Sequence, residues 1–456
     1  MRQLLQDAAQ RAMRYLEDLD GRGVAPAQSA VERLPELGGA LPEQPGDPLE
    51  VLRLLDEIGS PATVATAGRR FFGLVIGGSL PVTVAANWLA AAWDQNAVFS
   101  TTSPVGAAVE EVALGWLVDI FRLPAGTGGA FVTGATLANL TALAAARRAV
   151  LKRAGWDVEA QGMQGAPEVK VVVGAEAHPT LIKALSLLGF GRERLVQVPV
   201  DRQGRMRAEA LPNLSGPCIV CIQAGNVNSG AFDPAPEICA RAHAVGAWVH
   251  VDGAFGMWAA AAPARAHLMA GFSEADSWAT DAHKWLNVPY DSGMAFVRDA
   301  EALRAAMSVS GPYLVHGAVR EPSHYTPELS RRARGVEVWA ALRALGRQGL
   351  AEQIERCCRL ATRFAQGLAA AGCEVLNDVV LNQVVVAFGD AERTRRVIAG
   401  IQADGTCWCG GTVWQGRSAM RISVSSWATT EDDVDRSLAA MLRIARVPCA
   451  AHQDHE

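Results

Sequence analysis

Residues 218–254 read CIVCIQAGNVNSGAFDPAPEICARAHAVGAWVHVDGA. Two apolar runs, CIVCIQAG and AWVHVDGA, enclose an alanine-rich stretch. Strands that are apolar on both faces are typical of parallel sheets whose two sides are covered by helices. The stretch therefore predicts a strand–helix–strand unit of an α/β domain.

The same alternation continues on both sides of this unit. Further apolar runs are VKVVVG (169–174) and GMAFVRD (293–299). We expect a large α/β domain with a mostly parallel sheet over residues 76–330. The remaining pattern predicts a small α+β domain over residues 331–456. Its expected elements are a long helix at 335–371, strands at 381–388 and 418–426, and helices at 391–403 and 430–444.

The first residues of the chain predict an amphipathic helix. Apolar residues recur there at three-to-four spacing, at Leu5, Ala9, Ala12, Leu16 and Leu19. Such a helix needs a surface to lie on, and a partner subunit is one candidate. We expect residues 1–75 to form an N-terminal helical segment that wraps around the partner.

Composition and charge restrict the class of partner. The chain has 456 residues, half of them apolar, and a net charge of -5. This small charge favours neither nucleic acid nor an anionic membrane surface as a partner. No signal peptide and no run of ~18 uncharged apolar residues is evident. We expect a cytoplasmic protein that binds a small molecule.

The nine cysteines do not predict a metal site. Their odd number in a long chain favours reduced thiols over a disulfide framework. Cys218 and Cys221 would point to opposite faces of one strand, so they cannot close a tetrahedral site. Cys407 and Cys409 would share a face, but no second ligand pair completes their site.

Lysine is rare in this chain, and Lys284 is distinctive among the four lysines. It lies in DSWATDAHKWLNVPYDSG (276–293), between His283 and Trp285. A partly desolvated amine at this place would have a lowered pKa and could act as a nucleophile. The local sequence alone also allows a structural lysine.

Asp252 follows the apolar residues of the strand AWVHVD. Ligand clefts of open α/β sheets form at the carboxyl ends of strands. A carboxylate there can hold a ring-nitrogen cation protonated, or it can cap the following turn.

Two further segments pass from a strand into a helix. GGAFVTGATLANL (128–140) offers a helix start near Thr136, where free backbone N–H groups can cradle a phosphate. VVVGAEAHPTLIKAL (171–185) places His178 at a similar junction. A hydrogen-bonded loop histidine is the alternative interpretation of His178.

The order of these four features resembles that of the group II pyridoxal-phosphate-dependent amino-acid decarboxylases, which include aromatic-amino-acid and glutamate decarboxylases. The resemblance extends from RRFFGLVIGG (69–78) to RISVSSWATTEDDVDRSL (421–438). It implies the type I fold of aspartate aminotransferase and pyridoxal 5'-phosphate as cofactor. It also implies a homodimer with each active site at the subunit interface.

The resemblance implies roles for individual residues. Lys284 matches the Schiff-base lysine, and Asp252 matches the partner of the pyridine nitrogen. The other matches surround the ring and its phosphate: Ala254 and His178 on the two ring faces, with Ala135, Thr136 and His283 near the phosphate.

Four positions bear on departures from the family pattern and on the substrate. Asn226 stands where relatives often have threonine near the cofactor, and Asp281 stands where many have asparagine. A second acid near a phosphate would repel it unless the acid turns away. Phe99 matches a substrate-binding position, and Arg421 matches an arginine that meets the substrate carboxylate. Arg421 can equally be structural.

The implied reaction converts an L-amino acid to its amine and carbon dioxide. The substrate would be an aromatic or a small acidic or aliphatic amino acid. Tyr325 is the predicted proton donor at Cα, with Tyr313 and His324 as competitors. The alternatives are aldehyde synthesis, carbon–carbon lyase action or transamination on the same scaffold, or a non-catalytic scaffold.

Overall fold

The computed structural model describes residues 1–308 and 320–446, which group into two compact units. The large unit holds residues 77–359 and 377–383. The small unit holds residues 1–76, residues 360–376 and those from 384 onward. No helix in the described ranges is both long and apolar enough to cross a membrane.

A seven-stranded sheet forms the centre of the large unit, in the order β1-β7-β6-β5-β4-β2-β3. Only β7 runs antiparallel to its neighbours, which confirms the expected mostly parallel sheet. Every residue of the five strands from β1 to β4 in this order is buried, because both faces are covered. The strands are β1 (Gly128–Val132), β2 (Lys170–Gly174), β3 (Val196–Val198), β4 (Cys218–Gln223), β5 (Trp248–Asp252), β6 (Ser277–Asp281) and β7 (Gly293–Val297).

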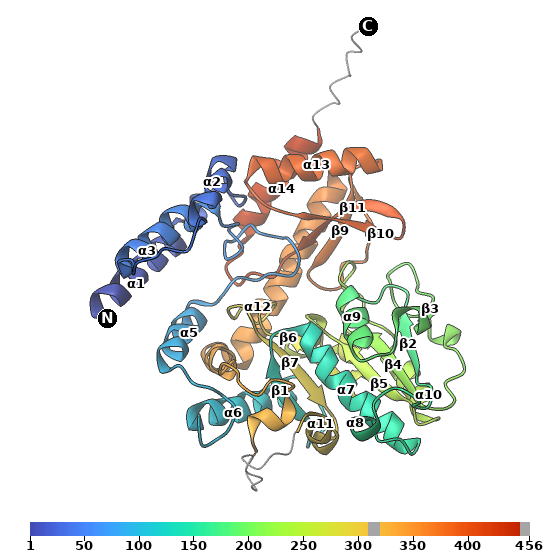
Figure 1. The fold of residues 1–456 in the computed structure, drawn as a ribbon. Helices are drawn as coiled ribbons and strands as arrows, with labels where there is room; N and C mark the ends of the chain where they lie inside the picture. The colour runs from blue at the N-terminus through green and yellow to red at the C-terminus, as the bar shows by residue number, and fades with distance from the viewer. Residues whose placement is uncertain (309–319, 447–456) are drawn as a thin grey trace. The chain divides into compact units, whose positions relative to one another are not determined.

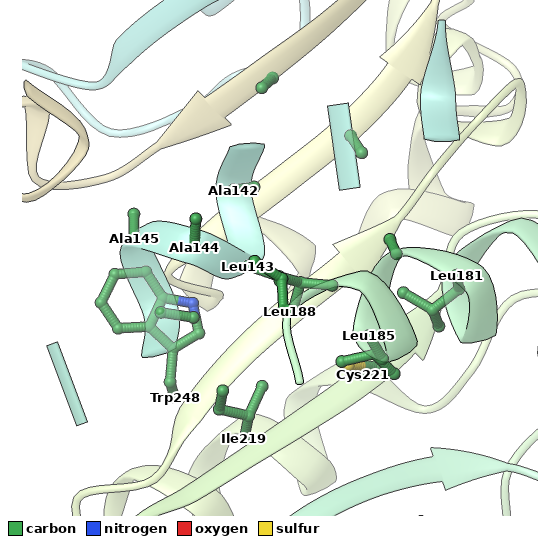
Figure 2. Packing of buried hydrophobic residues seen from close by; sticks show 14 of the residues in the cluster. Ala142, Leu143, Ala144, Ala145, Leu181, Leu185, Leu188, Ile219, Cys221 and Trp248 are labelled. Carbon is green, nitrogen blue, oxygen red and sulfur yellow. The ribbon is translucent and has the colours of Figure 1, made fainter. Parts of the chain in front are cut away.

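Helices α7 (Ala135–Arg153) and α9 (Pro179–Leu187) lie beside each other on one face of this sheet (Figure 1). Figure 2 shows the core between them, where Trp248, Ile219 and Cys221 of the strands meet apolar side chains of both helices. Burial of one large apolar side chain stabilises a fold by roughly 1.5–3 kcal/mol. The many alanines of α7 allow the helix to approach the sheet closely.

Helix α10 (Ala235–His243) covers the opposite face. The β2–α9–β3 connection moves toward one edge of the sheet, whereas β4–α10–β5 moves toward the other edge. Parallel crossovers are right-handed, so the two connecting helices lie on opposite faces. The large unit also contains α5 (Pro81–Trp93), α6 (Pro104–Ile120), α8 (Val158–Gln161) and α11 (Ala300–Met307).

The small unit contains a four-stranded sheet in the order β10-β11-β9-β8. Helices α13 and α14 pack so closely that a Cβ added at Gly400 would lie 2.8 Å from Ile444. The elements are β8 (Glu374–Val375), β9 (Gln383–Ala387), β10 (Gly410–Trp414), β11 (Arg417–Ser423), α13 (Ala391–Asp404) and α14 (Glu431–Ala445). The N-terminal helices are α1 (Arg2–Glu17), α2 (Gln28–Glu32), α3 (Pro48–Leu54) and α4 (Ser60–Ala62).

The unit boundaries differ from the expected division at residues 75/76 and 330/331. Residues 1–76 group with the C-terminal part of the chain, where the Arg70 guanidinium lies 3.3 Å from the Asp433 carboxylate. Helix α12 (Gly335–Ala370) has non-helical backbone angles at Gly346. Its first part belongs to the large unit, since Gln353 Nε2 donates to the Trp285 carbonyl at 2.7 Å.

Candidate active site

The start of α7 lies against the beginning of β7. Val132, the last residue of β1, pairs with Gly293 of β7, and α7 begins three residues later at Ala135. A Cβ on Gly293 would lie 2.4 Å from the Gly134 Cα, so only glycine allows this close approach. The free N–H groups of a first helical turn favour an anion. Ala135 and Thr136, the predicted phosphate-loop positions, are the first two residues of α7.

Asp281 ends β6 and connects this helix start to Lys284. Its Oδ1 accepts from the Ala135 backbone N–H at 2.6 Å, and its Oδ2 lies 3.0 Å from Lys284 Nζ. The side chain of Asp281 is 2% exposed and that of Lys284 is 20% exposed. The predicted nucleophile is thus largely buried and lies beside the predicted phosphate cradle.

His283 completes this cluster from the loop after β6. Its Nδ1 accepts from the Ser292 backbone N–H at 3.0 Å, and its ring stacks on Tyr290 at 4.2 Å. Its Nε2 lies 3.7 Å from Asp281 Oδ1. Burial lowers the pKa of His283, while Asp281 opposes that change. Because Nδ1 accepts, a neutral His283 carries its proton on Nε2, toward the cradle.

Asp252 ends β5, the neighbour of β6, and is buried. Burial raises the pKa of its carboxyl group, while the positive charges of His178 and Lys284 oppose the change. The structure thus brings these three predicted residues together. Ala254 follows closely, and its backbone oxygen accepts from the Asp281 N–H at 2.9 Å.

His178 caps the start of α9 in the loop that follows β2. Its Nδ1 accepts from the Thr180 backbone N–H at 3.3 Å and lies 2.7 Å from the Thr180 hydroxyl. These contacts fix the ring orientation by its Nδ1 edge. The hydrogen-bonded loop histidine and the ring-stacking histidine are therefore compatible interpretations of one residue.

Gln223 is a site neighbour that the sequence analysis did not identify. It ends β4, pairs with Asp252, and donates from Nε2 to the Glu176 carbonyl at 3.1 Å, in the loop that carries His178. Asn226 donates from Nδ2 to the Gln223 Oε1 at 3.2 Å, while its own Oδ1 caps the turn that follows. The contacts of Asn226 are thus with other residues of the protein. The signal in the sequence that could have identified Gln223 is a polar residue at the end of an apolar strand.

Phe99 lies in a loop that the segment after residue 320 holds in place. The Ser100 backbone N–H donates to Glu321 Oε2 at 2.6 Å, and the Ser323 N–H donates to the Val98 carbonyl at 3.1 Å. Phe99 itself is half-buried. Its assignment to substrate binding stays a prediction.

Tyr325 lies apart from Lys284 within its own chain. Its ring is 4.5 Å from the Arg320 guanidinium, and Arg320 Nη2 donates to the Gly129 carbonyl at 2.8 Å. Gly129 lies near the end of β1 away from Val132, whereas the cradle and Lys284 lie at the Val132 end. The competitor His324 is buried next to Tyr325, and Tyr313 lies outside the described residues.

Arg421 belongs to the other compact unit, in β11. Burial lowers the pKa of its guanidinium. The contact of Arg421 with a substrate carboxylate stays a prediction. The alternative, that Arg421 has a structural role, stays a prediction as well.

The clustered residues of the large unit fit pyridoxal phosphate. The Ala135 amide already binds an anionic oxygen, that of Asp281, which shows that this helix start accepts such a group. Asp252 supplies a buried carboxylate for a ring-nitrogen cation, and Lys284 supplies the amine. The residues available to hold the phosphate are Ala135, Thr136 and His283, and those for the ring are Asp252, Ala254 and His178.

Comparison with known proteins supports the same conclusion. The profile of the pyridoxal-dependent decarboxylase conserved domain matches residues 38–388. The aromatic-L-amino-acid decarboxylase of Bacillus atrophaeus is 27% identical over 81% of this chain and 78% of that protein. The L-2,4-diaminobutyrate decarboxylase of Rhizobium meliloti is 30% identical over 78% of this chain and 72% of that protein. The crystal structure of Oryza sativa TDC with PLP and tryptamine superposes with a TM-score of 0.90 at 23% identity, over 97% of both chains. The expected fold is thereby confirmed, and the chain belongs to the pyridoxal-dependent decarboxylase family.

Proposed function

We propose that this chain converts an L-amino acid to its amine and carbon dioxide, with pyridoxal phosphate attached at Lys284. The observation that carries the proposal is that Asp252 ends the strand next to β6, while Asp281 at the end of β6 contacts both Lys284 Nζ at 3.0 Å and the N–H of Ala135 at the start of α7. When bound, pyridoxal phosphate supplies an electron sink for the electron pair that the departing carboxylate leaves behind.

The surrounding residues supply position and charge. Asp252 would keep a proton on the ring nitrogen, because a buried carboxylate favours a paired cation over an unpaired charge. His178 and Ala254 would bind the two ring faces. Gln223 would keep His178 in place through its bond to the Glu176 carbonyl. Asn226 would support Gln223.

The proton for the substrate Cα has two candidate donors. Lys284 Nζ is the amine of the cluster itself, whereas Tyr325 lies near the far end of β1 in the same chain. The Tyr325→Phe variant separates them. A rise of aldehyde or keto-acid products relative to amine would assign the proton to Tyr325, and an unchanged ratio would leave Lys284 as the donor.

The substrate class is proposed from Phe99 and Arg421, as an aromatic or a small acidic or aliphatic amino acid. A screen of amine release over the protein amino acids would identify it. Release of an aldehyde, of carbon–carbon cleavage products or of a keto acid in place of the amine would favour the alternative reactions.

The attachment at Lys284 is tested with a pair of lysine variants. Wild-type protein supplemented with pyridoxal phosphate should show a visible absorption band, and borohydride should fix the cofactor to the peptide that contains Lys284. Lys284→Ala should lose the band and the activity. Lys183→Ala, an exposed lysine on α9, should keep both. No labelled peptide in the wild-type protein, or a label elsewhere, would contradict the assignment.

We further propose that the chain works as a homodimer. Helix α1 contains no buried residue, and its apolar Leu5 and Leu16 are 59% and 43% exposed. On α5, Trp88, Leu89 and Trp93 are 44%, 54% and 44% exposed. Exposed apolar groups of this size are typical of protein–protein contact surfaces. A second copy of the chain is the proposed partner for both helices.

We also propose that the chain works in the cytoplasm. The eight cysteines among the described residues carry no disulfide. Burial raises the pKa of Cys218 to about 11 and that of Cys239 to about 12, so these thiols stay protonated. Reduced, unreactive thiols suit a reducing compartment.

A further inference from the structure

Asp281 occupies the position at which the cofactor phosphate would bind the helix start. Its Oδ1 accepts from the Ala135 N–H at 2.6 Å, and its side chain is almost fully buried. A carboxylate and a phosphate oxygen are both acceptors, so they compete for one amide hydrogen. Asp281 is therefore an internal anion at the predicted phosphate cradle.

The backbone around Asp281 fixes it in this position. Its N–H donates to the Ala254 carbonyl at 2.9 Å, and its own carbonyl accepts from Trp258 Nε1 at 2.9 Å. It also pairs with Gly293, the glycine that lets α7 approach β7. The carboxylate therefore cannot leave the cradle by a shift of its strand.

The groups that face Asp281 are mostly donors or cations. They are the Ala135 N–H at 2.6 Å, Lys284 Nζ at 3.0 Å and His283 Nε2 at 3.7 Å. The negative Asp252 also acts on this cluster. An incoming phosphate meets a cradle whose positive potential Asp281 has already partly neutralised.

We propose that Asp281 weakens the grip of the site on the phosphate group by competing for the start of α7, and so sets how readily the chain loads its cofactor. The proposal rests on the assignment of α7 as the phosphate cradle. Asp281 acts here as a competing anion and takes no part in bond breaking.

The test separates the phosphate from the rest of the cofactor. The probes are pyridoxine 5'-phosphate and pyridoxine, which differ only by the phosphate and carry no aldehyde for Lys284. The ratio of their dissociation constants measures the contribution of the phosphate. In Asp281→Asn the phosphate should favour binding at least about tenfold more than in wild type, since a charged competitor is removed. An unchanged or smaller contribution would overturn the proposal.

Two further variants control the measurement. Asp291→Asn removes an acid that acts on His283 but pairs with Arg334, so it should leave the phosphate contribution unchanged. An equal gain in Asp291→Asn would show a general charge effect and overturn the specific role. Asp281→Ser supplies a second neutral acceptor if Asp281→Asn fails to fold, and it should raise the contribution likewise. If wild type forms the borohydride-fixed adduct at Lys284 but the phosphate contributes equally to binding in wild type and in Asp281→Asn, only this inference fails. If wild type forms no such adduct, the proposed function itself fails.

Discussion

His250 lies two residues before Asp252 on the same side of β5 and is completely buried. Trp248 Nε1 donates to the Ser277 hydroxyl oxygen at 2.9 Å, so the hydroxyl hydrogen is free for His250 Nδ1, also at 2.9 Å. His250 Nε2 faces the acceptor Asn139 Oδ1 at 2.8 Å. These contacts select the neutral ring with its proton on Nε2, and they tie β5 and β6 to α7 beneath the site.

Burial lowers the pKa of His250 to about 3 from an ordinary value of 6.5. Below pH 6.5 the unfolded chain takes up a proton that the folded chain refuses until about pH 3. The stability that the chain gains from burying a neutral His250 is therefore fully present above pH 6.5. On acidification below that pH, the free energy of unfolding falls by about 1.4 kcal/mol per pH unit. Denaturant unfolding of wild type and His250→Gln between pH 7 and 5, roughly the upper part of this range, should give converging stabilities. If the stabilities of the two proteins instead changed in parallel with pH, the prediction would be wrong.

At single positions, the sequence identified the chemistry but not the contacts. Asp252 and His178 could be found because each ends or follows an apolar strand, and strand ends meet at one edge of a sheet. Lys284 could be found because lysine is rare in this chain. The contacts of Gln223 and of Asp281 with Ala135 depend on which strands are neighbours and on how closely α7 approaches β7. Sequence spacing does not contain that information.

Among the elements, the junction of β7 with α7 leaves no space for an added side-chain atom. A Cβ on Gly293 would lie 2.4, 2.6 and 2.8 Å from backbone atoms of Gly134, which have no flexible end to move aside. Gly293→Ala should therefore destabilise the large unit by about 1–3 kcal/mol and weaken cofactor binding. Gly115→Ala on α6, where the added Cβ meets no atom within 4 Å, is the matched control. Thermal unfolding with and without pyridoxal phosphate measures both effects, and equal behaviour of the two variants would contradict the prediction.

Strands β2, β4, β5 and β7 were predictable because their apolar runs are continuous. Strand β6 was not, since Ser277, Thr280 and Asp281 interrupt its pattern. These polar residues are tolerated because each has a partner: Ser277 bonds to Trp248 and His250, Thr280 donates to the Ala254 carbonyl at 3.5 Å, and Asp281 bonds to Ala135. Strand β6, which leads to Lys284, is thus stabilised by tertiary hydrogen bonds that its sequence pattern does not predict.

For the molecule as a whole, the exposed face of α5 predicts self-association. Replacing Trp88 and Leu89 together by serine should shift the protein from dimer to monomer, because both side chains are about half exposed in the single chain. Sedimentation or light scattering at several protein concentrations would measure the shift. Val413→Ser on β10 removes a single apolar side chain that is 66% exposed, and it should leave the dimer intact. Monomeric wild-type protein would refute the proposed assembly.

The place of β7 between β1 and β6 also determines when the sheet can close. Among the described residues, the only strand that pairs with β1 is β7, and Val132 of β1 pairs with Gly293 of β7. The ribosome synthesises Gly293 long after Val132. Until residue 297 has emerged, β1 remains an unpaired apolar strand, a type of edge that invites wrong pairing. Such long-range pairing is slow. The nascent chain therefore carries this unpaired edge until β7, which packs against the start of α7, has been made.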